Sequence, residues 1–94
     1  MSLPLDILNH PNPFNPSTTI SFSLPRESEV SLYVHDSAGR IVARILRGES
    51  LPVGSHEVKW DGRNERGVAT ASGVYFCRLV AGKETIVRKM VLAR

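Results

Sequence analysis

Three histidines and several carboxylates are the side chains of this sequence that could act as general acids, bases or metal ligands. The histidines are His10, His35 and His56. No Gly-x-Ser-x-Gly elbow, His-Glu-x-x-His helix or glycine-rich phosphate loop accompanies them. His35 is predicted to lie on the outer face of its strand, and His56 is the first residue of another predicted strand. Both positions favour a solvated surface side chain. The sequence predicts no catalytic residue, no cofactor and no enzyme activity, although a longer parent protein could be a secreted enzyme.

The segment Asp61–Gly67 superficially resembles an acidic calcium loop. Arginines occupy positions 63 and 66, and no glutamate closes the loop at its twelfth position, where that chemistry requires a bidentate ligand. An aspartate followed by glycine is also the usual composition of a tight turn. We therefore expect a turn here and no metal site.

Two further side chains could be reactive or could bind ligands. Cys77 is the only cysteine, so no internal disulfide can form, and its place between Tyr75 and Leu79 on one strand face predicts a buried, inert thiol. Trp60 ends a short strand, and a large aromatic there is expected to fill the core. An exposed Trp60 that stacks against a carbohydrate is the alternative.

The net charge of +3 is unevenly distributed, with −3 in residues 1–39 and therefore +6 in residues 40–94. The cations of the second half are interleaved with aliphatic residues rather than clustered, and aromatic residues make up only 6%. A nucleic-acid footprint needs a denser cationic surface with exposed aromatics. We expect no nucleic-acid partner, and no membrane insertion because the sequence lacks an apolar run of about 18 residues.

The elements that position these residues are predicted to be strands. Seven glycines and six prolines interrupt the chain too often for ordinary helices. Val30, Leu32 and Val34 alternate with polar residues at the period of two that a half-buried strand requires. Similar runs predict strands at Leu5–Asn9, Thr18–Leu24, within Arg26–Ala38, and at Arg40–Leu46, His56–Trp60, Gly73–Val80 and Glu84–Leu92.

The connections between these strands predict a sandwich. Asp36–Gly39 and Ala81-Gly82 have the composition of hairpin turns, so the third strand should pair with the fourth and the sixth with the seventh. Asp61–Ser72 should cross between two sheets. Asn9–Ser17 has three prolines and cannot be a central strand. We expect an all-β, immunoglobulin- or fibronectin-III-like seven-stranded antiparallel β-sandwich, with a core of Ile20, Phe22, Leu24, Val30, Leu32, Val34, Val58, Trp60, Tyr75, Leu79, Met90 and Leu92.

One domain is expected over residues 9–94. Residues 1–8 would combine the first strand with linker residues, and Met1–Leu3 would be a cloning remnant. At 94 residues the chain has material for one thin core, and little for a deep substrate cavity.

Several short motifs follow one another in a fixed order along residues 9–94. They are Pro11-Asn12-Pro13-Phe14-Asn15-Pro16-Ser17-Thr18-Thr19-Ile20, Val30-x-Leu32, Asp36-x-x-Gly39-Arg40, Gly54-x-His56-x-Val58-x-Trp60-Asp61-Gly62, Ser72-Gly73-Val74-Tyr75-Phe76 and Lys89-Met90-Val91-Leu92. The ordered set resembles the C-terminal sorting domain of cargo proteins of the type IX secretion system. It is also similar to the immunoglobulin-like domain of flagellar hook-capping proteins.

The resemblance implies a non-catalytic address, carried at the C-terminus of a larger cargo and recognised by secretion machinery proteins. The parent would pass through the periplasm and outer membrane and become secreted or attached to the cell surface. The last strand would be the recognition element, through Lys89, Met90, Val91, Leu92 and Arg94. The alternative is a structural linking or assembly domain, as in the hook-capping relative or a spacer in a secreted multidomain hydrolase. We expect a monomer.

The remaining motif residues are expected to be structural. Phe14 would dock on the edge of the sandwich after Pro13, and Trp60 and Tyr75 would fill the core. Asp61 and Gly62 would form a turn, as would Gly39. Gly73 would start its strand where a side chain would crowd a neighbour. These residues are Pro13, Phe14, Gly39, Trp60, Asp61, Gly62, Gly73 and Tyr75.

Overall fold

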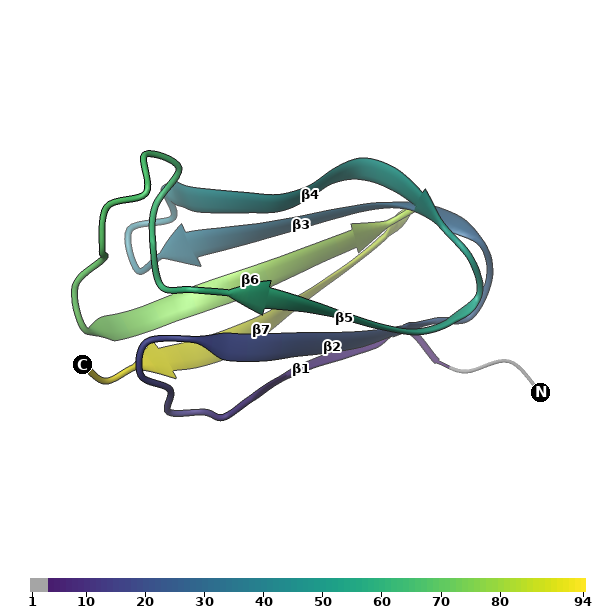
Figure 1. The fold of residues 1–94 in the computed structure, drawn as a ribbon. Coiled ribbons are helices and arrows are strands. Elements are labelled where there is room, and N and C mark those ends of the chain that lie inside the picture. Colours follow the sequence, from purple (N-terminus) through teal and green to yellow (C-terminus); the bar gives the residue numbers. More distant parts are fainter. Residues whose placement is uncertain (1–3) are drawn as a thin grey trace.

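The computed structural model describes residues 4–94, which form seven antiparallel strands in two packed sheets (Figure 1). The smaller sheet has the order β1-β2-β5 and the larger β4-β3-β6-β7. This arrangement confirms the predicted all-β sandwich. The strand bounds are β1 Asp6–His10, β2 Thr18–Leu24, β3 Ser28–Asp36, β4 Ile41–Leu51, β5 Gly54–Trp60, β6 Gly73–Ala81 and β7 Glu84–Leu92.

The connections between the strands are those that the turn residues predicted. β3 pairs with β4 and β6 with β7, each through a short hairpin. The segment 61–72 leaves β5 in the smaller sheet and enters β6 in the larger one. β4 pairs with β3 and not with β5, which distinguishes the arrangement from a constant-type immunoglobulin domain. In residues 4–94 no helix has the length and apolar character needed to cross a membrane.

β4 is longer than the sequence indicated. The prediction ended this strand at Leu46, but pairing with β3 continues to Leu51. The register between β3 and β4 shifts around Leu32, and Gly48 has a φ of 68° with its N–H donated to Ser31 Oγ at 3.0 Å. Gly48 therefore lies in a β-bulge, and the strand continues beyond it.

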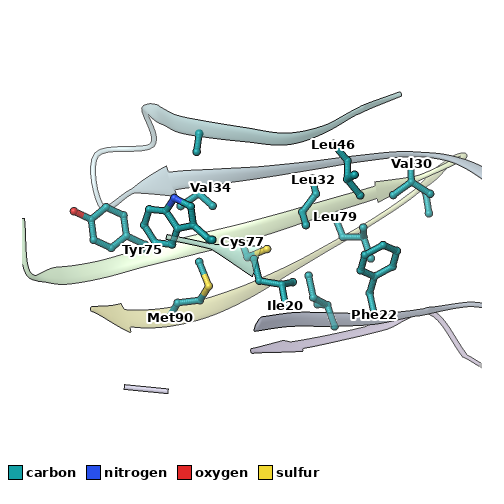
Figure 2. Packing of buried hydrophobic residues seen from close by; sticks show 14 of the residues in the cluster. Ile20, Phe22, Val30, Leu32, Val34, Leu46, Tyr75, Cys77, Leu79 and Met90 are labelled. Carbon is teal, nitrogen blue, oxygen red and sulfur yellow. The ribbon is translucent and has the colours of Figure 1, made fainter. Parts of the chain in front are cut away.

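The core lies between the sheets, where the labelled side chains of Figure 2 point toward one another. Eleven of the twelve predicted core residues are buried. The exception is Val58, which is only partly buried and packs against the core cluster. Neighbouring strands do not fully cover its position on edge strand β5. Among residues 4–94, six further apolar residues are buried: Ile7, Phe14, Ala43, Leu46, Cys77 and Ala81. The proposed cloning remnant at Met1–Leu3 lies outside the described residues.

Candidate recognition surface at the C-terminal strand

β7, which carries most of the recognition residues that the family resemblance implies, is an edge strand of the larger sheet. Its side chains alternate, and this alternation divides the predicted residues into two sets. Met90 and Leu92 are 0% and 1% exposed and belong to the core, whereas Lys89 is exposed and Val91 half-buried on the outer face. Only the second set is available to a partner while the domain is folded.

The backbone edge of β7 is partly covered by residues 12–14, which we call the edge clamp. Phe14 N donates to Val91 O at 2.9 Å, and Ala93 N donates to Phe14 O at 2.9 Å. The Asn12 side chain accepts from Val91 N at 3.0 Å and donates to Lys89 O at 3.4 Å. The proline-rich segment is not a central strand, as predicted, and Phe14 lies at a sheet edge as expected, but the hydrogen bonds with β7 were not anticipated.

Phe14 anchors the edge clamp in the core. Its ring is 5.6 Å from that of Trp60 in an edge-to-face arrangement, and Trp60 is in turn 5.2 Å from Tyr75. Trp60 is 2% exposed and donates its indole N–H to Arg63 O at 3.0 Å, while Tyr75 donates its hydroxyl to Ala71 O at 2.6 Å. The core role predicted for Trp60 is confirmed, and a carbohydrate-stacking role is wrong because its faces are buried. Pro13 lies between Asn12 and Phe14 and, lacking an N–H, donates nothing.

Arg94 is held by the connection between β5 and β6, and we call these contacts the C-terminal lock. Its guanidinium donates to Thr70 O at 2.6 Å through Nε and to Gly62 O at 2.7 Å through Nη2. Its backbone N–H donates to Ser72 Oγ at 2.9 Å. In Figure 1 the C-terminus lies at the same end of the sandwich as this connection and the proline-rich loop. The sequence did not indicate that Arg94 would be occupied in this way.

Gly62 is where these segments meet. It has a φ of 73°, and a Cβ there would lie 2.7 Å from Pro16 O and 3.0 Å from Arg94 Nη2. The predicted turn is present, since Asp61 Oδ1 accepts from Arg63 N at 3.1 Å. No group of three or more potential metal ligands occurs in residues 4–94.

Gly39 and Gly73, two further glycines of the motifs, have backbone conformations that favour glycine. Gly39 has a φ of 84° in the β3–β4 hairpin, where Asp36 Oδ1 accepts from the backbone N–H groups of Ala38 and Arg40. The hydrogen bond from the Arg40 N–H is the main cause of a lowered pKa of Asp36. At Gly73 the predicted crowding is wrong, because a Cβ would meet nothing within 4 Å; its φ of 151° is what favours glycine.

The side chains with possible reactivity occupy separate elements. Burial raises the pKa of the Cys77 thiol to about 12, so the thiolate needed for nucleophilic attack is not formed near neutral pH. His10 is exposed at the end of β1. His35 and His56 are less solvated than predicted, because both are half-buried. His35 on β3 bonds the carbonyl of Gly39, and His56 stacks on Phe22 at 5.4 Å.

Residues 11–84 of this three-plus-four sandwich match the model of the FlgD Ig-like domain. The chain belongs to the FlgD Ig-like domain family. Ig-like modules of this family are not enzymes, and the hook-capping relationship inferred from the motifs is confirmed. The matched residues end at Glu84, so they leave out nearly all of β7.

Solved structures give the same fold. FlgD from P. aeruginosa is 24% identical with a TM-score of 0.64, and the alignment covers 97% of this chain and 75% of that one. Dimeric latent PorU from Porphyromonas gingivalis is 26% identical with a TM-score of 0.71, and 95% of this chain covers 9% of PorU. PorZ, described as an essential surface component of the type IX secretion system of that bacterium, is 24% identical with a TM-score of 0.66, and 94% of this chain covers 11% of PorZ. No curated protein matches.

Proposed function

We propose that this FlgD-like Ig domain is a non-catalytic sorting module, recognised by type IX secretion machinery and directing a larger parent protein to the cell surface or medium. The observation that supports the proposal is how the two halves of β7 are held. It is an edge strand whose C-terminal half is clamped and locked. In its N-terminal half Arg88 donates to Ile7 O of β1 at 2.9 Å, but within residues 4–94 the outward backbone groups of Thr85 and Val87 have no partner. The ordered motifs and the likeness to PorU and PorZ agree with this role.

The open edge is defined by the hydrogen bonds of the edge clamp. Val91 and Lys89 direct backbone groups away from β6, toward Asn12 and Phe14. Because strand groups alternate with a period of two, Thr85 and Val87 direct their N–H and C=O groups to the same side. In residues 4–94 nothing bonds to those outward groups. An extended segment of a partner would add a strand there, and the exposed side chains of Val87 and Lys89 would contribute selectivity.

The partners follow from this proposal. The domain would be continuous with an N-terminal cargo and would be monomeric. This chain spans about a tenth of PorU and of PorZ, so the activity and location of any longer protein also belong to the proposal.

A reporter exported through this domain tests the proposal. Removal of residues 85–94 should abolish export, but it also removes Met90 and Leu92 from the core. Val87→Pro is a sharper variant, because proline deletes the outward N–H without removing a hydrogen bond to β6, and edge strands tolerate it. Val87→Thr keeps the N–H and is the matched control. We expect Val87→Pro to reduce export at least tenfold while Val87→Thr exports normally; equal export of the two folded variants would exclude edge recognition.

A structural linking or assembly role is the second candidate, and the coverage of FlgD favours it. The likeness extends over 75% of that chain, compared with about a tenth of PorU and PorZ. A linking domain would continue into another domain beyond Arg94, and the complete reading frame distinguishes the two roles. Export of a reporter that carries this domain at its C-terminus would count against the linking role.

A further inference from the structure

The outer face of the larger sheet carries a patch of paired aromatic, aliphatic and basic side chains, which we call the basic face. Cross-strand register places Tyr33 beside Arg78, Arg78 beside Val87, His35 beside Phe76, and Phe76 beside Lys89. All six residues lie on the face opposite the core, since Val34, Cys77 and Met90 point inward. The basic face comprises Tyr33, His35, Phe76, Arg78, Val87 and Lys89.

The cations of the basic face have no carboxylate partner. Five ion pairs occur among residues 4–94, and they use Arg40, Arg44, Arg47, Arg63 and Arg88. Arg78 instead holds its guanidinium 5.5 Å above the centre of the Tyr33 ring, and Lys89 extends to solvent. On β6 and β7 no acidic side chain lies beside them, because Glu84 is at the far end of β7, and Asp36 at the end of β3 is paired with Arg40 at 2.9 Å.

Two polar atoms of the basic face are buried without a hydrogen-bond partner: Nε of Arg78 and Nε2 of His35. Both residues line a shallow hollow of about 350 Å³ whose walls also include Asp36, Phe76 and Val87. A buried polar atom without a partner carries a desolvation cost that a ligand can relieve. Val87 is 56% exposed, and such a side chain beside a hollow offers apolar contact.

We propose that the basic face binds an acidic polypeptide segment of a partner protein, with a carboxylate placed between Arg78 and Lys89 and an adjacent apolar side chain seated in the hollow against Phe76 and Val87. Charge complementarity selects this occupant, because Arg78 lines the hollow and Lys89 lies beside Phe76 in the register, whereas the carboxylate of Asp36 in the hollow's wall is already paired with Arg40. Arginine stacked on an aromatic ring is pre-organised for a carboxylate. This site shares Val87 and Lys89 with the proposed edge contact, but it lies on the face of the sheet, and peptide binding to it does not depend on the export role.

A titration of the 94-residue chain followed by amide chemical shifts tests the proposal. The probe is an acetylated, amidated heptapeptide that alternates valine and glutamate, and its glutamine counterpart is the uncharged control. We expect the acidic peptide to shift the amides of Phe76, Arg78 and Val87, with an affinity that falls as salt is added. Shifts confined to the smaller sheet, or equal shifts with the glutamine peptide, would overturn the assignment.

Single substitutions distinguish peptide binding at the basic face from non-specific charge attraction. Lys89→Gln and Arg78→Gln should each weaken binding about fivefold, and the exposed Lys89 keeps the test valid if Arg78→Gln unfolds. Lys59→Gln, an exposed lysine on a strand of the other sheet, is the matched control and should change the affinity less than twofold. An equal loss with Lys59→Gln, or binding to phosphatidylglycerol vesicles without binding to the peptide, would refute the site.

Discussion

Replacing Phe14 by alanine tests whether the proline-rich segment is part of the core. Phe14 is 2% exposed, and its ring contacts Trp60 edge-to-face at 5.6 Å. Truncating a buried phenylalanine costs about 3–5 kcal/mol, which combines lost burial with the cavity left behind. Its two backbone hydrogen bonds with β7 would remain possible, so we expect a loss of about 3–4 kcal/mol in the free energy of unfolding.

Urea denaturation followed by Trp60 fluorescence measures this loss. For a domain of this size a destabilisation of 3 kcal/mol corresponds to a fall in Tm of more than about 12 °C. Leu8→Ala is the control, since Leu8 is 51% exposed on the neighbouring β1 and should cost less than about 1 kcal/mol. A loss below about 1 kcal/mol for Phe14→Ala would show that the segment rests on the surface, and the edge clamp would then lack its anchor.

Three further predictions concern single sites. Gly62→Ala should destabilise the fold by about 2–3 kcal/mol in urea titrations, because its Cβ would meet Pro16 O, whereas Gly67→Ala, with φ 78° and open space, should cost about 1 kcal/mol. Cys77, whose pKa is raised to about 12, should not react with iodoacetamide at pH 8 until urea unfolds the chain. The lowered pKa of Asp36 means that its contribution to stability is present above the unfolded pKa and is lost as pH falls through the folded pKa; Asp36→Asn should therefore narrow the stability difference between pH 7 and pH 3, measured by thermal unfolding.

The parts of the fold that depend on local signals could be predicted from the sequence. β2 begins and ends where its alternation begins and ends, and the Asp36–Gly39 hairpin follows from residues that bond within four positions. The extent of β4 could not be predicted, because a bulge opposite β3 decides whether Gly48 breaks or continues the strand. That choice depends on tertiary pairing rather than on local composition.

The candidate surface was harder to predict because its contacts are distant in sequence. Asn12 and Lys89 are 77 positions apart, and Arg94 reaches Gly62 across 32. Hydrophobic periodicity carries no information about which side chain will cap an edge strand. One available signal was the run of prolines with an asparagine and a phenylalanine between them. Such a run cannot enter a sheet but can present single N–H and C=O groups to one.

The structure of β7 limits how a folded domain can be recognised. Met90 and Leu92 cannot be core residues and partner contacts at the same time, whereas Lys89 and Val87 point to solvent. Substitutions at Met90 and Leu92 would therefore impair recognition through loss of stability, and substitutions at Lys89 and Val87 would impair it directly. If a partner recognises the folded domain, variants at Lys89 and Val87 that are equally stable must differ in how well they are recognised. A partner that extracts the strand must first break the edge clamp and the C-terminal lock, so weakening Asn12 or Arg94 would then increase recognition rather than decrease it.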